Sequence, residues 1–343
     1  MKTILTGDRP TGKLHLGHYF GSLENRVKLQ YDYDTYILIA DVQALTDNFN
    51  NPEKVREYVY ELALDYLGAG IDPKQAHIYI QSLIPEVAEL TVYFSNLVSV
   101  PRLYRNPTTK FEVGQKKSLF GEGGENITYG FLGYPVSQAA DIACVNSNII
   151  PVGEDQLPHI EQAREILRKF NSIYGETFNI PEPLIPEIGA RIKDLQEPTK
   201  KMSKSSTNEK AIIRLLDEPE VIRKKIMSAV TDSDNKIYFD EENKPGISNL
   251  LTIYSVLKDI SIEESVNLFK DSNYGTFKKA VADIVVEKIT NLQNKYNEII
   301  NSNLIDEILD EGYKKTNEIA KKKYYEVKEK VGLGRTDNIR LYQ

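Results

Sequence analysis

The 343-residue sequence contains a single cysteine, Cys144, and no tryptophan. One cysteine cannot form an intrachain disulfide, and it cannot supply the thiolates of a cysteine-based zinc site or an iron–sulfur cluster. Basic residues are also in deficit: 43 Lys and Arg stand against 50 Asp and Glu, which gives a formal net charge of −7. This balance disfavours a dedicated basic clamp for nucleic acid but leaves room for local basic patches.

Long apolar runs are absent as well. The N-terminus reaches Asp8 and Arg9 too soon for a signal peptide, and no run approaches the length that crosses a bilayer. We therefore expect a cytoplasmic protein with no membrane partner. Hydrophobic residues at 41% and charged residues at 27% are typical of a globular chain, and the length suggests two or three domains.

Short apolar runs alternate with helix-period segments through the first half of the chain. This alternation predicts an α/β fold with a doubly wound parallel sheet. We expect strands at 4–6, 36–40, 76–81 and 149–152. We expect helices at about 16–30, from Pro52 (capped by Asn51) to Gly68 and Gly70, through Leu90–Leu97, and through Ile160–Leu167.

Strand patterns fade beyond about Leu215, and helical periodicity takes over. It predicts helices at 217–230, 246–258, 261–270, 276–301 and 303–330. Two polar stretches interrupt the regular pattern. The glycine-rich segment 113–126 suggests a mobile loop or lid, and the lysine-rich segment 193–210 suggests an exposed loop.

The first motif runs from Gly7 to His18 with the sequence Gly-Asp-Arg-Pro-Thr-Gly-Lys-Leu-His-Leu-Gly-His. It lies between the first strand and the first helix, the phosphate-binding end of a doubly wound fold. Gly12 and Gly17 would let a phosphate or an adenine ring approach the backbone. His15 and His18 would share one face of the opening turn and donate to phosphate oxygens. The alternative is a surface helix cap with two solvated histidines.

The second motif is Lys201-Met202-Ser203-Lys204-Ser205. Two lysines on a flexible loop form a movable positive charge that can close on a pyrophosphate leaving group and open to release it. The alternative for a generic charge run is a solvated linker. This five-residue string is too specific to expect by chance.

Together the two motifs resemble the HIGH and KMSKS signatures of class I aminoacyl-tRNA synthetases, with Leu16 in place of Ile. Five further segments follow in one register and resemble the tryptophanyl branch of that class. They are Tyr134-Pro135, Ala139-Ala140-Asp141-Ile142, Gly153-Glu154-Asp155-Gln156, Gly189-Ala190-Arg191-Ile192 and Lys244-Pro245-Gly246-Ile247-Ser248-Asn249. The sequence is identified on these residues as a member of the bacterial tryptophanyl-tRNA synthetase family.

The resemblance implies a Rossmann-like, HUP-type catalytic domain at 1–195 and a helical anticodon-binding domain at 196–295. The terminal helices, about 296–343, would pack back onto the catalytic domain. The implied substrates are L-tryptophan, ATP with Mg²⁺, and tRNA(Trp), and no zinc or iron–sulfur cluster is expected. The implied assembly is a symmetric homodimer, the commonest closed arrangement of identical subunits.

The resemblance also assigns roles to individual residues. The catalytic residues would be His15, His18, Lys201 and Lys204. The ATP-binding residues would be Arg9, Pro10, Thr11, Gly17, His18, Gly153, Glu154, Asp155, Ile192, Lys201, Met202, Ser203, Lys204 and Ser205. The tryptophan-binding residues would be Leu5, Gly7, Gln43, Tyr134, Gln138, Asp141 and Gln156.

Residue chemistry supports the role of Asp141 independently. An indole ring has one polar group, an N–H that can only donate, so a selective pocket needs a buried acceptor. A carboxylate on a helix is a strong acceptor, and the neighbours of Asp141 are apolar, which predicts that it is buried. The alternative is a carboxylate on the helix surface.

Three positions depart from the commonest bacterial members of the family. Arg9 stands where many have Gln, Gln43 where many have His, and Gln138 where Met is usual. His77 and His159 are interpreted as ordinary structural or surface residues. Two other functions remain open on sequence alone: a tyrosine-charging enzyme on the same fold, and a regulatory paralogue that charges no tRNA.

Overall fold

A five-stranded parallel sheet forms the centre of the first half of the chain. The computed structural model describes residues 1–185, 192–202, 208–300 and 304–334. The strands, in the spatial order β3-β2-β1-β4-β5, are β3 (Ala76–Ile80), β2 (Asp34–Ile39), β1 (Thr3–Asp8), β4 (Ile149–Pro151) and β5 (Glu182–Leu184). All four neighbouring pairs are parallel. The predicted doubly wound sheet is confirmed, and its order reverses at β1, where ligands bind in such folds.

The four predicted strands are present, and β5 is the strand that the sequence did not predict. Its three residues include Pro183 and carry no apolar run, so nothing in the local pattern marks them as a strand. Successive residues of β2 face opposite sides of the sheet. Ile37 and Ile39 join one apolar cluster, and Tyr36 and Leu38 join the other.

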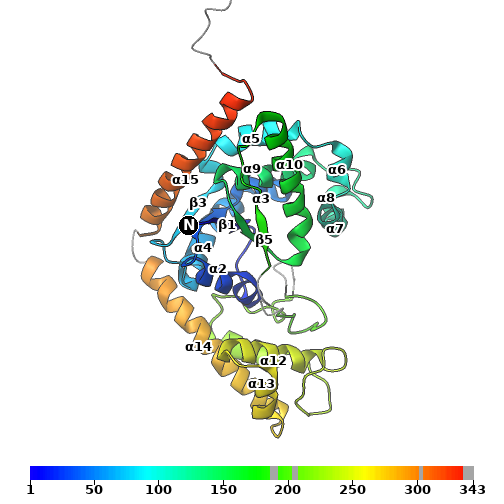
Figure 1. Cartoon of the computed structure of the whole chain (residues 1–343). Coiled ribbons are helices and arrows are strands. Elements are labelled where there is room, and N and C mark those ends of the chain that lie inside the picture. The colour runs from blue at the N-terminus through cyan, green and yellow to red at the C-terminus, as the bar shows by residue number, and fades with distance from the viewer. Residues whose placement is uncertain (186–191, 203–207, 301–303, 335–343) are drawn as a thin grey trace, which may run out of the picture.

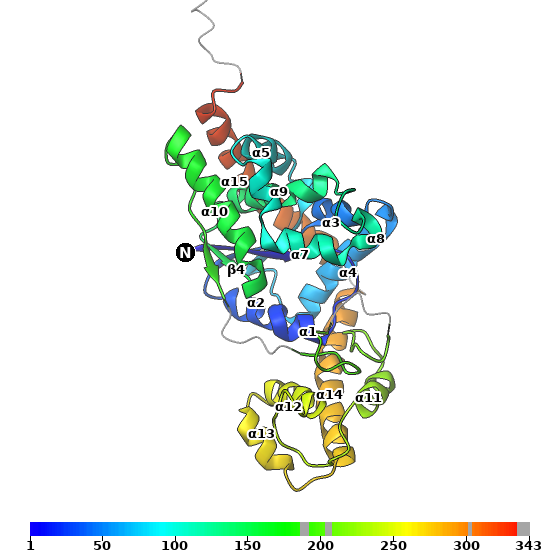
Figure 2. The ribbon, with the colours of Figure 1, turned by 90° about the vertical axis from the view of Figure 1, so that its right-hand side faces the viewer.

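Helices cover both faces of the sheet (Figures 1 and 2). The Ile37 face packs against the helical segment after β1 and against α4. The Leu38 face packs against α5, α9 and α10. The elements of this half are α1 (Leu16–His18), η1 (Tyr19–Leu23), α2 (Glu24–Leu29), α3 (Asp41–Asn48), α4 (Pro52–Ala69), η2 (Gln81–Leu83), α5 (Glu86–Ser95), α6 (Val100–Tyr104), α7 (Pro107–Gln115), α8 (Lys117–Phe120), α9 (Tyr129–Cys144), η3 (Glu154–Gln156) and α10 (Leu157–Tyr174).

The second half of the chain is helical, as predicted. Its helices are α11 (Pro219–Met227), α12 (Pro245–Lys258), α13 (Ile262–Phe269), α14 (Tyr274–Ile300) and α15 (Leu304–Lys330). In Figure 1, α12 and α13 lie below the sheet, and α15 runs along its β3 edge. The approach to β3 is close, since a Cβ at Gly312 would lie 1.8 Å from the carbonyl oxygen of Ile78.

Several local predictions were wrong in detail. Asn51 stands at the N-cap of α4, but its side chain makes no capping hydrogen bond. Gly68 lies inside α4, and Gly70 alone ends the helix with φ of 110°. The helix expected to run through Leu97 ends at Ser95.

The segment 113–126, predicted as a loop, contains the end of α7 and all of α8. Phe120 is fully buried against Phe131, and Val113 packs on the same small cluster. Burial of these apolar side chains outweighs the poor helix propensity of the glycines around them. Gly121 and Gly124 serve the turn that follows, because both have positive φ.

Candidate active site

The inner cavity, as we name it, lies at the carboxyl ends of β1 and β4 and has a volume of about 420 Å³. All seven predicted tryptophan-binding residues line it: Leu5, Gly7, Gln43, Tyr134, Gln138, Asp141 and Gln156. They come from β1, α3, α9 and η3, which are far apart in the sequence. Gly7 is needed here for the approach of two strands, since a Cβ would lie 2.1 Å from the carbonyl oxygen of Leu38.

Asp141 is the most deeply buried acidic group of the inner cavity, with 2% of its surface exposed. The Gln81 side-chain amide donates to both of its carboxylate oxygens at 2.9 Å. The amide oxygen of Gln81 in turn accepts the backbone N–H of Gln43 at 3.0 Å. Burial raises the pKa of Asp141 to about 7, and the Gln81 hydrogen bond only partly offsets this. The predicted burial of Asp141 is confirmed.

Sequence reasoning missed Gln81. It follows β3 directly, and a polar residue at the carboxyl end of a buried parallel strand is a recognisable feature of ligand sites. Gln81 does not line the inner cavity itself. It orients the Asp141 carboxylate, which does line it.

Tyr134 joins a second buried network at the inner cavity. Its hydroxyl contacts Glu112 Oε2 at 2.8 Å and His159 Nε2 at 2.6 Å. Burial raises the pKa of Tyr134, and the Glu112 carboxylate raises it further. His159 was interpreted as an ordinary structural or surface residue, but it is only 1% exposed and bonds directly to a site residue. Gln138 Oε1 is buried and finds no hydrogen-bond partner among the described residues.

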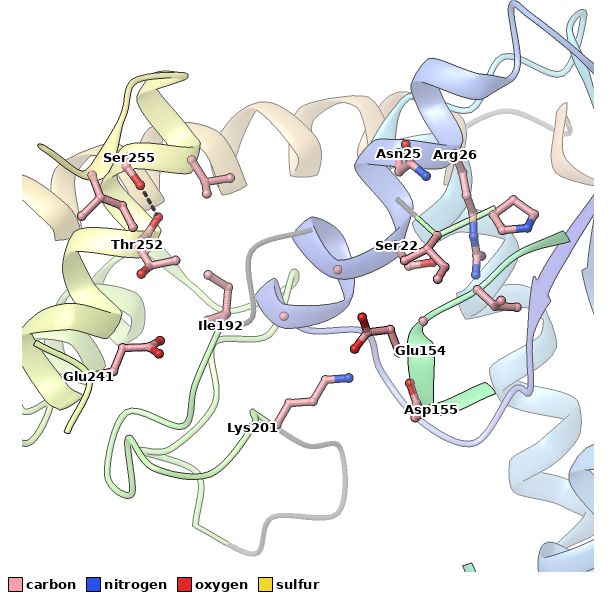
Figure 3. Close-up of a pocket in the computed structure, with 18 of the residues that line it drawn as sticks. Ser22, Asn25, Arg26, Glu154, Asp155, Ile192, Lys201, Glu241, Thr252 and Ser255 are labelled. Carbon is pink, nitrogen blue, oxygen red and sulfur yellow. Dashed lines mark hydrogen bonds between the residues drawn. The ribbon is translucent and has the colours of Figure 1, made fainter. Parts of the chain in front are cut away.

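The outer cavity, as we name the adjoining space, has a volume of about 710 Å³. Six of the predicted ATP-binding residues line it: Gly17, Gly153, Glu154, Asp155, Ile192 and Lys201. Figure 3 shows the Lys201 side chain extending toward Glu154 and Asp155. The opposite wall of the outer cavity is formed by residues before and within α12, among them Glu241, Thr252 and Ser255.

The two cavities adjoin because they share part of their lining, including Gly153, Asp155 and Lys201. The shared lining also contains Arg26, a residue that sequence reasoning missed. Arg26 is 5% exposed and forms an ion pair with Asp8. Burial alone would lower the pKa of Arg26, but the Asp8 carboxylate outweighs it and raises the pKa.

The two histidines of the first motif lie together, with ring centroids 3.8 Å apart. His15 is 2% exposed, and neither ring lines the inner or the outer cavity. The His15 ring lies directly beneath Gly17, where an added Cβ would be 3.0 Å from Cε1. Only the backbone of Gly17 therefore lies between the His15 ring and the outer cavity.

Other predicted nucleotide contacts are distributed differently. Arg9 lines the inner cavity and pairs with Asp47 at 3.1 Å. Pro10 and Thr11 line neither cavity. The Met202 side chain is 1% exposed and packs in the apolar core, because a thioether is more stable there than beside phosphates. The remaining motif residues lie outside the described part of the chain: Ser203, Lys204 and Ser205.

Among the residues that the structure describes, no group of three or more His, Cys, Asp or Glu side chains is placed to hold a metal ion. Within the same ranges, no helix is long and apolar enough to cross a membrane.

Two adjoining cavities at the switch point of a parallel sheet lie where doubly wound folds bind nucleotides and small ligands. The family model described as "tRNA synthetases class I (W and Y)" matches residues 1–290. The chain therefore belongs to the class I tRNA synthetases of the tryptophanyl and tyrosyl group.

Individual relatives of the chain belong to the tryptophanyl branch of this group. The chain is 42% identical to the tryptophan–tRNA ligase of Bacillus anthracis over 98% of its own length and 99% of the relative's. It is 43% identical to the tryptophan–tRNA ligase of Oceanobacillus iheyensis, over 98% and 100%.

Solved structures agree with these relatives. The tryptophanyl-tRNA synthetase of Mycoplasma pneumoniae superposes with a TM-score of 0.85 at 30% identity, covering 97% of this chain and 98% of that one. The Campylobacter jejuni enzyme, solved with ADP and tryptophan, gives a TM-score of 0.82 at 32% identity, covering 96% and 100%.

Proposed function

We propose that this chain is a tryptophan–tRNA ligase: it activates L-tryptophan with ATP and transfers it to the 3′ end of tRNA(Trp). The observation that carries the amino-acid specificity is the buried Asp141 carboxylate, held by Gln81 in the wall of the inner cavity. It is the acceptor that an indole N–H requires. A site built around such a hydrogen bond rejects analogues that lack the donor far better than shape alone does.

In the first step, a carboxylate oxygen of tryptophan attacks the α-phosphorus of ATP. The bond to the bridging oxygen breaks, and pyrophosphate leaves with that electron pair, which gives tryptophanyl-adenylate. No general base is needed, because the carboxylate is already ionised at neutral pH. Catalysis is then positioning and charge stabilisation, which we assign to His15, His18, Lys201 and Lys204.

Lys201 is well placed for this role because it lines both cavities, and the reacting groups meet where the cavities adjoin. The His15 ring lies behind Gly17 and contacts the His18 ring, so we assign both histidines a role on the phosphate side only. In the second step, the terminal ribose hydroxyl of tRNA attacks the carbonyl carbon of the adenylate. The ester forms, and AMP leaves.

ATP and its Mg²⁺ belong to the same proposal. We assign adenine to the wall at Ile192 and the ribose to Glu154 and Asp155, since acidic groups suit hydroxyls better than phosphates. Mg²⁺ would arrive with the nucleotide and neutralise charge on its phosphates. The expectation of no zinc and no iron–sulfur cluster stays a prediction.

The helical region is the proposed tRNA-binding part, with domain limits at 1–195, 196–295 and about 296–343. Lys224, in α11, is exposed and suits a tRNA contact. Lys225 is buried in an ion pair with Asp217, and Lys323 donates to the carbonyl oxygen of Thr177. These two lysines hold the fold together, and we exclude them from the tRNA surface. A cytoplasmic location follows from the proposed tRNA substrate.

We also propose a homodimer. An apolar groove of about 600 Å³ backs onto the inner cavity, and the two share Gln43 and Tyr134. Large apolar side chains stand exposed along this groove: Val42 at 47%, Phe49 at 49%, Val100 at 57% and Tyr129 at 79%. Such a patch suits an isologous contact between two copies. Light scattering should give twice the 39.0 kDa chain mass, and Val42→Asp should give a monomer. A wild-type monomer at micromolar concentration would contradict the dimer.

The proposed activity is tested by amino-acid-dependent exchange of labelled pyrophosphate into ATP, with tryptophan, tyrosine and phenylalanine in parallel. Exchange with tryptophan alone supports the assignment. If tyrosine is the better substrate, the indole interpretation of Asp141 is wrong, although the fold and reaction class stand. Absence of exchange with any of the three amino acids would favour a regulatory paralogue.

A further inference from the structure

A buried chain of hydrogen bonds leads from the start of α7 to the inner cavity, and its proton order is fixed by a helix cap. The side-chain oxygen of Asn106 accepts the backbone N–H groups of Thr108 and Thr109, at 3.0 and 3.3 Å. The Asn106 amide nitrogen must then point the other way. It donates to His159 Nδ1 at 3.1 Å and to Gln162 Oε1 at 2.7 Å.

The orientation of the Asn106 amide determines which atoms carry the protons in the rest of the hydrogen-bond chain. Since His159 Nδ1 accepts, the ring proton of the neutral imidazole is on Nε2, which donates to the Tyr134 hydroxyl oxygen at 2.6 Å. Burial keeps the imidazole neutral by lowering the pKa of His159 to about 4. The Tyr134 O–H is then left to donate to Glu112 Oε2 at 2.8 Å. The chain ends on a carboxylate, the group best suited to accept without donating.

Glu112 differs from the other carboxylates of the inner cavity. It lines that cavity only, whereas Asp155 also lines the outer one. Asp8 is paired with Arg26, and Asp141 is held by Gln81. No cation among the described residues lies within ion-pair distance of Glu112. The lysine one turn later, Lys116, pairs with Asp47 instead.

An amino acid brings a positive charge into this cavity. Its α-ammonium group has three donors and no acceptor, and burying such a charge without a counter-ion is costly. Tyr134 and Gln156, two of the polar residues that line the inner cavity, are both uncharged. A carboxylate that is not already paired with a cation, such as Glu112 beside Tyr134, would supply the counter-ion.

We propose that Glu112 is the counter-ion for the α-ammonium group of the amino-acid substrate, and that Asn106, His159 and Tyr134 hold its carboxylate toward the inner cavity. This inference rests on the proposed function. Glu112 lies in α7, and its carboxylate faces Tyr134. His159 is a positioning residue, since it acts on the substrate through Tyr134.

The test uses the absence of tryptophan from the chain, because indole fluorescence excited at 295 nm comes from the ligand alone. Binding of L-tryptophan and of indole-3-propionate, which lacks the ammonium group, is titrated on the full-length wild type and on Glu112→Gln. The matched control is Glu122→Gln, which removes the same charge from an exposed ion pair with Lys117 outside the inner cavity. Thermal midpoints verify that each variant is folded.

We expect Glu112→Gln to weaken tryptophan binding at least about tenfold, the loss typical of a charge-assisted hydrogen bond. Binding of indole-3-propionate should stay unchanged or improve, and Glu122→Gln should match the wild type with both ligands. An equal loss for both ligands would make Glu112 a merely structural residue and overturn the proposal. Unchanged tryptophan binding would overturn it as well.

Two substitutions at His159 test the positioning role separately. His159→Gln keeps an N–H donor near the Nε2 position, whereas His159→Asn loses it. We expect His159→Asn to weaken tryptophan binding about fivefold with little effect on indole-3-propionate, and His159→Gln to retain most of the affinity. Equal behaviour of the two variants would contradict the proton order.

If the wild type neither binds tryptophan nor supports exchange, the proposed function falls and this inference with it. If the wild type is active and only the variant results disagree, this inference alone is overturned.

Discussion

The inner and outer cavities differ in what their walls are made of. The inner cavity is bounded by groups that are buried and already hydrogen-bonded to one another, as Asp141 is to Gln81 and Tyr134 to His159. The outer cavity is bounded in part by exposed residues: Glu154 lines only this cavity, Asp155 and Lys201 lie where the two cavities adjoin, and α12 forms its far side. One site is rigidly set by the fold, and the other presents charges to solvent.

This difference separates the two tasks of the proposed reaction. Buried, fixed groups discriminate between ligands, because a wrong ligand leaves them without a partner. Exposed charges contribute little to ground-state binding and act when charge develops on the phosphates. Changes at the inner cavity should therefore alter KM for tryptophan, and changes at the outer cavity should alter kcat.

The largest effect is expected from Lys201→Ala. Loss of a cation that stabilises the transition state should lower kcat for adenylate formation about 100- to 1,000-fold, with tryptophan affinity unchanged. Single-turnover measurements beside fluorescence titrations separate the two quantities. Lys200→Ala is the control, since Lys200 is exposed, pairs with Glu197 and lines neither cavity. A loss of tryptophan affinity equal to the loss in rate would break the distinction between the cavities.

The next largest effect is expected from Asp141→Asn. The amide removes the charged acceptor and places a donor beside Gln81, so KM for tryptophan should rise about 100-fold. KM for ATP should stay within twofold of the wild type, because Asp141 does not line the outer cavity. Steady-state exchange kinetics measure both constants. A rise in KM for ATP of the same size would show that the cavities are not independent.

The pH dependence of tryptophan binding should reflect the raised pKa of Asp141. The carboxyl is protonated below about pH 7 and then no longer offers a charged acceptor. KM for tryptophan should rise about fivefold from pH 7 to pH 6, while KM for ATP changes less. Asp141→Asn should remove this dependence. An identical pH profile in the variant would assign the titration to another group.

The stability of the unliganded chain should follow the opposite trend at Asp141. The folded state holds the proton more tightly than the unfolded chain does, because the pKa is raised from 3.8 to about 7. The stabilisation is therefore complete below about pH 4 and is lost as the pH rises toward 7. Between these limits, the free energy of unfolding should depend less steeply on pH in Asp141→Asn than in the wild type.

The smallest effect is expected from Asp47→Asn. Asp47 holds both Arg9 at the inner cavity and Lys116 at the end of α7. Burial opposes ionisation of this carboxyl, but Arg9 and Lys116 lower its pKa. Loosening these contacts should raise KM for tryptophan about threefold to fivefold and leave kcat nearly unchanged. A change in kcat alone would place Asp47 with the outer cavity.

The sequence predicted the elements of the fold well because they carry strong periodic patterns. Four strands and the five helices after residue 215 lie within a few residues of their expected positions. β5 was missed because a three-residue strand containing Pro183 has no apolar run. α8 was missed because the burial of Phe120 depends on contacts with Phe131, which no local pattern reveals.

The same reasoning applies to the site. The motif residues predicted to bind tryptophan all line the inner cavity, because the resemblance fixes positions such as Tyr134 and Asp141, and their role stays a prediction. Residues that support them, including Gln81, Glu112 and His159, were missed because they come from other elements and meet only in the folded chain. A sequence motif identifies the residues expected to contact the ligand. The residues that hold them in place are brought together only by the fold.

The most direct test of the account compares tryptophan with β-(3-benzothienyl)alanine, in which sulfur replaces the indole N–H at nearly the same size. Kd is measured for both on the wild type and on Asp141→Leu. We expect the wild type to prefer tryptophan about 100-fold and the preference to disappear in the variant. Equal binding of the two ligands by the wild type would contradict the claim that Asp141 recognises the indole N–H.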